Sequence, residues 1–169
     1  MRQRLAGDHV ILRAMEEQDR DMLMALIREP DIIKVTKGYP SPDTYDHQIN
    51  WFCTAPDPTE SLRSIIASKE NPEAGLGILV LSNINHELGA AEIFIKLLQS
   101  ARGRGYGEDA VNTAVAYGLK ELGLNLICSH ILESNTASQR LFKKCGFRRQ
   151  KDLRNMWIYC GQSKRLKTG

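Results

Sequence analysis

The chain has 169 residues, of which 42% are hydrophobic and 25% charged, and its formal net charge is +3 at pH 7. These values predict one soluble globular domain spanning residues 1–169, without an apolar run of the ~18 residues that a membrane span needs. Scattered basic residues argue against a nucleic-acid-binding protein. A polar N-terminus, cysteines without a C-x-x-C pair and widely spaced histidines predict a cytoplasmic protein with reduced thiols and no metal site.

The first half of the chain shows both helical and strand patterns. In residues 17–28, acidic residues come early and Arg28 comes late, as the helix dipole favours. Ser41-Pro42 is a typical start of a second helix. The elements expected are a strand over 9–13, a helix over 17–28, a short aromatic-rich helix after Pro42, hairpin strands over 62–68 and 75–81, and a polar connection over 82–88.

The second half alternates strands with helices. The elements expected are a strand over 91–98, a glycine-rich turn, a helix over 108–119 that stops at Gly123, a strand over 125–132, a helix over 136–144 and a strand over 148–160. Two strands that are each followed by a helix, combined with the hairpin and helices of the first half, predict a mixed sheet with helices on both faces.

The turn between strand 91–98 and the next helix carries the strongest chemical signal. Glycine occupies every second position from Gly103 to Gly107, and glycine lets the main chain approach a ligand closely. A helix N-terminus adds free N–H groups and the positive end of its dipole. Arg102 and Arg104 add guanidinium groups that suit phosphate oxygens. The sequence predicts an anion site here; the alternative is a tight turn that binds nothing.

The spacing of the turn narrows the type of phosphate ligand. A Walker loop would need Lys-Ser/Thr, which is absent, and a dinucleotide loop would need glycine where the chain has Glu108. The pattern Gln/Arg-x-x-Gly-x-Gly/Ala is filled by Arg102, Gly105 and Gly107. This loop resembles the pyrophosphate loop of the GNAT superfamily of acyl-CoA-dependent N-acyltransferases.

A second stretch strengthens the resemblance. Residues 135–147 are similar to the family pattern Asn-x-x-Ser/Ala-x-x-Leu-Tyr-x-Lys-x-Gly-Phe and follow the glycine turn at the family's usual spacing. The chain looks most like the ribosomal-protein N-terminal and polyamine acetyltransferases. The resemblance implies an α/β (α+β) three-layer domain with a mixed, mostly antiparallel sheet of about six to seven strands and about four helices.

The resemblance also implies acetyl-CoA as cosubstrate. The central strand would hydrogen-bond the pantetheine arm and part from strand 125–132 to make a slot. The turn would hold the pyrophosphate, and the following helix would reach the pantetheine amides and line the thiol end. In that order, the residues implied are Ile95, Lys96 and Leu97; Arg102, Gly103, Arg104, Gly105, Tyr106 and Gly107; and Asn135, Ser138 and Phe142.

The implied chemistry is direct attack of an amine on the acetyl thioester. An alkylammonium group has a pKa of about 10.4, so a base has to remove its proton. Glu92 on the central strand is the candidate base; the alternative is that it only orients the amine. A main-chain N–H near Ile95 is the expected oxyanion donor.

Two features depart from the family pattern. Phe142 stands where many members have a tyrosine that protonates the departing thiolate, so water, Tyr106 or Cys145 would have to replace it. Only a short basic tail follows Gly161, where the family has another strand. The last strand must therefore be short, frayed or completed by a partner chain, as in a homodimer.

The expected function is acetyl transfer to a primary amine of a small molecule or a peptide N-terminus. The alternative is a CoA-binding sensor or a catalytically silent relative, which the loss of the tyrosine hydroxyl would explain. The segment 31–52, expected to wall the acceptor, has no acidic cluster, which argues against a polyamine.

Overall fold

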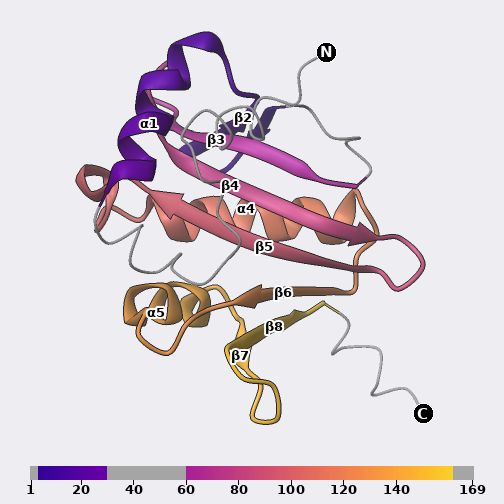
Figure 1. Cartoon of the computed structure of the whole chain (residues 1–169). Coiled ribbons are helices and arrows are strands. Elements are labelled where there is room, and N and C mark those ends of the chain that lie inside the picture. The colour runs from indigo at the N-terminus through magenta and orange to yellow at the C-terminus, as the bar shows by residue number, and fades with distance from the viewer. Residues whose placement is uncertain (1–3, 30–59, 162–169) are drawn as a thin grey trace.

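The computed structural model describes residues 4–29 and 60–161. The expected helix after Pro42 and the expected acceptor wall lie outside these residues. The described chain forms one sheet of eight strands with helices on both faces (Figure 1). The strands are β1 Arg4–Ala6, β2 Val10–Arg13, β3 Leu62–Ser68, β4 Gly75–Asn85, β5 Ala90–Leu97, β6 Leu126–His130, β7 Arg148–Arg149 and β8 Met156–Cys160.

Three α-helices lie in the described part of the chain. They are α1 Arg20–Arg28, α4 Tyr106–Lys120 and α5 Thr136–Lys144, and short 3-10 turns η1 Glu17–Asp19 and η2 Gln99–Ala101 precede α1 and α4. In Figure 1, α1 lies in front of the sheet and α4 behind it. The expected mixed α/β class is confirmed, although the sheet has more strands than the six to seven expected.

The core has one layer on each face of the sheet. Side chains alternate between the faces of a strand, whereas those spaced by three and four share a helix face. Helix α4 therefore packs its alanine and valine stripe, from Ala110 to Val115, on Ala91, Ile93 and Ile127. Helix α1 packs Leu23 and Leu26 on the opposite face, against Ile65, Ile78 and Val80.

Strands β5 and β6 form the parallel pair of an otherwise antiparallel sheet. The strand order is β1-β2-β3-β4-β5-β6-β8-β7. Pairing between β5 and β6 runs from Ala90↔Leu126 to Glu92↔Cys128, while β5 continues to Leu97 and β6 to His130. Figure 1 shows the two strands diverging from that point. The expected parting of these strands is therefore observed, and we call its apex at Glu92 the fork.

Strand β4 is longer than expected. The segment 82–85 belongs to the strand rather than to a polar connection, because Ile84 returns to the core and is buried. A register shift between Ser82 and Asn85 interrupts the pairing with β5, and Asn83 adopts a positive φ of 49° there. The polar residues that suggested a loop instead occupy this irregularity.

The segment 148–160 is a hairpin rather than one strand. Its polar middle cannot be buried and makes a turn, in which Asn155 has a positive φ of 62°. Strand β8 lies between β6 and β7, with Ile158 paired to Cys128 and to Arg148. The hairpin thus supplies the strands of the sheet that lie beyond β6.

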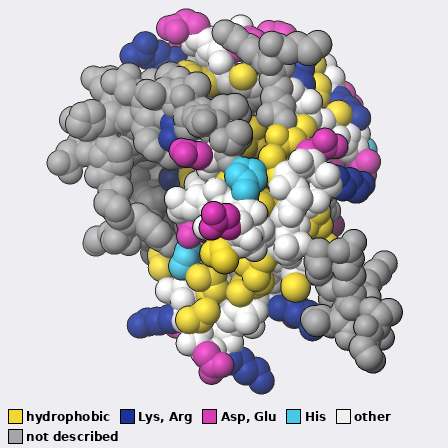
Figure 2. All heavy atoms as spheres, turned by 90° about the vertical axis from the view of Figure 1, so that its right-hand side faces the viewer, with side chains coloured by type: hydrophobic (Ala, Val, Ile, Leu, Met, Phe, Trp, Pro, Cys, Tyr) yellow, Lys and Arg dark blue, Asp and Glu magenta, His cyan; other side chains and the backbone are white. Residues whose placement is uncertain are grey.

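Charged side chains are dispersed over the end of the molecule that carries the β4–β5 turn. Figure 2 shows Lys and Arg there singly, separated by acidic and uncharged groups, while hydrophobic atoms gather lower down, at the level of β6 and β8. The described residues on this face form no basic stripe of the kind that nucleic acids bind. None of the described helices is long and apolar enough to cross a bilayer.

Candidate active site

The edge of β5 beyond the fork carries main-chain groups that face no strand. Leu98 N donates to Leu76 O at 2.9 Å, and hydrogen-bonded pairs alternate along an antiparallel ladder. The main chain of Lys96 is therefore turned to β4, whereas that of Ile95 and Leu97 is turned to the gap beside β6. An extended ligand could pair with this edge as an added strand. The expected role of Ile95 and Leu97 fits this geometry, and that of Lys96 does not.

The glycine turn between η2 and α4 presents a row of N–H groups. Gly103 and Gly105 adopt positive φ angles of 75° and 82°, and a Cβ at either would meet no atom within 4 Å. Gly105 is the N-cap residue of α4. In the described part of the chain, no acceptor receives the main-chain N–H groups of residues 103–108. These donors and the helix dipole make a site for an anion.

The two arginines of the turn have different surroundings. The Arg102 guanidinium donates to Leu97 O from Nε at 3.1 Å and from Nη2 at 2.8 Å, and Nη2 lies 3.1 Å from Glu29 Oε2. Arg104 is exposed. We expected both guanidinium groups to reach a pyrophosphate, but Arg102 is engaged with neighbouring protein groups and Arg104 alone stands exposed beside the turn.

Helix α5 begins where the second motif predicts. Asn135 caps it, and its Oδ1 accepts from Ser138 N at 3.2 Å. Because the cap uses the side-chain oxygen, the amide Nδ2 of Asn135 remains a donor for a ligand. Helices α4 and α5 come close at Gly107, where a Cβ would lie 3.2 Å from Leu97 Cδ1 and 3.3 Å from Leu141 Cδ2. Gly107 therefore serves packing rather than turn conformation.

The candidate proton donors to a thiolate lie near the start of α4 and the end of α5. Phe142 is 2% exposed and packs edge-on against Phe147, with 4.9 Å between ring centroids. Cys145 Sγ lies 3.8 Å from Glu108 O, and burial raises the pKa of this thiol to about 11. Tyr106 is half-buried in the first turn of α4. A buried thiol with so high a pKa is a poor proton donor to a thiolate.

Glu92 lies at the fork, half-buried on the face of the sheet that carries α1. Its Oε2 accepts from Asn83 Nδ2 at 3.2 Å, across from β4. Burial, together with the negative charge of Glu92, raises the pKa of its neighbour Cys128. Lys96 projects on the same face, where burial lowers its pKa and Nζ lies 5.8 Å from the centre of the Phe94 ring.

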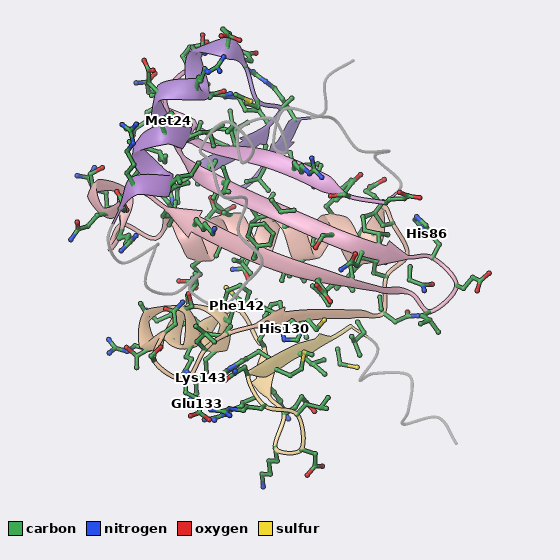
Figure 3. All side chains as sticks on the ribbon, viewed as in Figure 1. Met24, His86, His130, Glu133, Phe142 and Lys143 are labelled. Carbon is green, nitrogen blue, oxygen red and sulfur yellow. The ribbon has the colours of Figure 1, made fainter. Side chains whose placement is uncertain are left out.

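One histidine shares this region with Glu92. Side chains two residues apart on a strand lie on the same face, so His130, at the end of β6, faces the same way as Cys128 and its partner Glu92. Figure 3 labels His130 at the end of β6 that parts from β5, whereas His86 lies at the opposite end of the sheet. His130 is exposed and is a second group able to accept a proton.

Sequence reasoning missed two residues that shape the site. The polar sequence around Asn83 predicts a loop, which gives no indication of its contact with Glu92. Glu29 is the C-cap residue of α1, where an acid is unfavourable to the helix dipole. That misfit is the signal that could have shown that Glu29 has a partner elsewhere. No group of three or more potential metal ligands occurs among the described residues.

Comparison with known proteins identifies the family. A family model described as an acetyltransferase (GNAT) domain matches residues 9–148. The chain belongs to the GNAT family of acetyltransferases. It is therefore an acyltransferase of a family that uses acetyl-CoA as cosubstrate, as the two motifs predicted.

Individual GNAT proteins resemble the chain over most of its length. Uncharacterized N-acetyltransferase p20 of Bacillus licheniformis is 28% identical over 153 residues, which are 89% of this chain and 85% of that protein. A GNAT-family acetyltransferase from Bacillus anthracis superposes with a TM-score of 0.79 at 17% identity, covering 95% of this chain and 100% of the other.

A polyamine enzyme has the same fold. Spermidine N-acetyltransferase from Vibrio cholerae, solved in complex with CoA and spermine, superposes with a TM-score of 0.71 at 20% identity, covering 88% of this chain and 91% of the other. At this identity the likeness concerns the fold.

Proposed function

We propose that this GNAT protein moves the acetyl group of acetyl-CoA to a primary amine of a small molecule or a peptide N-terminus. The observation that carries the proposal is the fork: β5 and β6 part at Glu92↔Cys128, and the edge of β5 beyond it faces no strand. A carboxylate stands at the apex of this gap, and the N–H groups of the glycine turn stand near its open end.

The chain's own groups suit two parts of the cosubstrate, the pantetheine arm and the diphosphate. The carbonyl of Ile95 and the N–H of Leu97 would pair with the pantetheine amides, assisted by the Nδ2 of Asn135. The N–H groups of residues 103–108, with Arg104, would hold the diphosphate. Exposed single contacts of this kind contribute only about 0.3–1 kcal/mol each, so the affinity depends on several acting together.

The acceptor amine would be deprotonated at Glu92. A carboxylate positioned by Asn83 at the apex of the gap can take a proton directly or through one water. The N–H of Ile95 faces the gap and would stabilise the negative charge that develops on the thioester oxygen.

The departing thiolate needs little help. A thiol has an ordinary pKa of about 8.5, so the thiolate is a tolerable leaving group near neutral pH. Transfer of a proton to it from Cys145, whose pKa is about 11, would be uphill by more than two pKa units, or about 3 kcal/mol. A thiolate that leaves unprotonated can take its proton from solvent afterwards, or from Tyr106.

One observation favours a second function. Because Phe142 carries no hydroxyl and Cys145 is a poor acid, the site lacks the acid that many relatives use. A protein that binds acetyl-CoA but transfers its acetyl group slowly or not at all would have these features. For the enzymatic function, by contrast, the spermine complex of the Vibrio cholerae relative supports an amine as the class of acceptor.

Binding of acetyl-CoA is tested by changing the glycine turn. Gly105→Ala strains a residue at φ 82° and places a methyl group where the ligand would lie. We expect at least about tenfold weaker acetyl-CoA binding, which is about 1.4 kcal/mol. Gly123→Ala is the matched control, because Gly123 also has a positive φ, 67°, and an open Cβ position, but at the far end of α4. Equal affinities of the two variants, measured by calorimetry, would contradict the proposed site.

Turnover separates enzyme from silent binder. Thiol release from acetyl-CoA should appear with at least one member of a panel of small amines and peptide N-termini. Tight binding with no release above hydrolysis for any acceptor would favour the second function.

A further inference from the structure

Glu29 and Arg102 form a network just before the glycine turn. The Glu29 carboxylate accepts Gln99 N at 2.9 and 3.1 Å and pairs with Arg102 Nη2 at 3.1 Å. Arg102 in turn holds Leu97 O by two donors. The side chains of Glu29 and Arg102 are only 18% and 34% exposed. The last residue of β5, the first residue of η2 and the end of α1 are thus tied at one point.

The network acts on the strand edge that the proposed function uses. Leu97 O faces the gap, so Arg102 satisfies a carbonyl that would otherwise end the open edge without a partner. The contact fixes the position of Leu97 and, through the short η2 turn, that of Gly103. A planar guanidinium that makes several bonds is stiffer than an ammonium group would be.

We propose that Glu29 and Arg102 are positioning residues that hold the end of β5 and the start of the glycine turn in register for the pantetheine arm. This proposal rests on the proposed function. It assigns the arginine of the glycine motif to the protein scaffold and leaves the diphosphate to Arg104 and the N–H row. Because Glu29 caps α1, it also joins the helix on the opposite side of the sheet from α4 to the cosubstrate loop.

Pantetheine distinguishes this role from phosphate binding, because it lacks the diphosphate. We expect Glu29→Gln and Arg102→Gln to weaken binding of both CoA and pantetheine by a similar factor, about five- to tenfold, measured by calorimetry well below each variant's melting temperature. The double variant should be no weaker than Arg102→Gln alone, because the pair acts as one unit. Arg104→Gln is the control: it should weaken CoA binding and leave pantetheine binding unchanged.

Whether Glu29→Gln weakens or tightens CoA binding decides between a positioning role and a diphosphate-binding role for Arg102. If Arg102 served the diphosphate and Glu29 only competed for it, removing the carboxylate would tighten CoA binding. Tighter binding by Glu29→Gln, or unchanged pantetheine binding by Arg102→Gln, would overturn the proposal. A merely structural pair would lower the melting temperature and leave both affinities unchanged. Failure of the wild-type protein to bind CoA would instead contradict the proposed function.

Discussion

At the scale of single residues, Glu92, the proposed base, lies at the apex of the fork. It lies at the last pair of the parallel ladder, so the adjoining gap begins beside its side chain. Asn83 orients its carboxylate from the neighbouring strand. His130 lies on the same face of the next strand and is the competing proton acceptor.

Separate substitutions of Glu92 and His130 test whether Glu92 is the base. Glu92→Gln keeps the size of the side chain and removes the base, so kcat should fall by about a hundredfold or more with acetyl-CoA affinity little changed. His130→Gln is the matched control and should retain most of the activity in the same steady-state assay. A loss of activity in His130→Gln but not in Glu92→Gln would show that His130, on β6, is the base.

Residues were predictable where a pattern fixes both identity and position. Asn135 occupies a motif whose cap geometry is local, and Gly105 needs a left-handed conformation that few other residues tolerate. The engagement of Arg102 could not be predicted, because its partner Glu29 comes from a distant part of the chain. An arginine beside a glycine turn has the same local sequence whether it binds phosphate or protein.

At the scale of elements, Asp109 joins the start of α4 to the β1–β2 turn. Its carboxylate accepts the N–H groups of Asp8 at 3.0 Å, His9 at 2.7 Å and Val10 at 2.8 Å. Burial alone would raise the pKa of Asp109, but the three donors outweigh it and hold the pKa below its ordinary value of 3.8. The helix that presents the N–H row is thereby fixed to the edge of the sheet.

The depressed pKa makes the contribution of Asp109 depend on pH. A carboxylate with a lowered folded-state pKa stabilises the fold fully above its ordinary pKa, and the stabilisation is lost as pH falls below it. Asp109→Asn should therefore lower the free energy of unfolding by about 1–2 kcal/mol at pH 7, and the difference from wild type should shrink below pH 3.8.

A neighbouring acid provides the control for this measurement. Glu108 lies in the same helical turn and is exposed, so Glu108→Gln removes the same charge without the three acceptor contacts. Urea titrations at a series of pH values should show a smaller loss at pH 7 for this control. Equal losses of stability for both variants would mean that the effect comes from the helix dipole rather than from the three hydrogen bonds that Asp109 accepts.

Elements were predictable to the extent that their hydrophobic periodicity was continuous. Strand 62–68 and helix 136–144 match β3 and α5 residue for residue. The predicted strand over 75–81 is shorter than β4 because the last four residues of β4 include polar side chains. No pattern predicts β1, because three residues carry too little periodicity. The sequence does not indicate the hairpin over 148–160, because its turn contains no glycine or proline.

At the scale of the whole molecule, a buried ion pair joins segments that are distant in sequence. Arg13 and Asp19 are 2% and 1% exposed and meet in a two-pronged contact at 2.7 and 2.8 Å. Arg13 also donates to Pro72 O and Glu73 O, in the turn between β3 and β4. The pair thus connects β2, η1 and the central hairpin.

Removing one member of this pair should destabilise the protein strongly. Asp19→Asn leaves a buried guanidinium without its counter-charge, and breaking such a pair costs about 3–5 kcal/mol. Glu133→Gln is the comparison, because Glu133 and Arg149 are 58% and 52% exposed and surface pairs contribute about 0–1 kcal/mol. Urea denaturation of both variants should separate them clearly. A loss of under 1 kcal/mol for Asp19→Asn would show that the buried pair is dispensable.

The fork has a mechanical consequence for the molecule as a whole. Main-chain pairing between the plate β1–β5 and the smaller plate β6–β8–β7 is limited to three residue pairs, from Ala90↔Leu126 to Glu92↔Cys128. The rest of the boundary between β5 and β6 is open, and a cosubstrate bound there, as proposed, would hold the two parts of the sheet together. Binding of acetyl-CoA should make the boundary between β5 and β6 more rigid. Release of CoA should let the two parts of the sheet move relative to each other about Glu92.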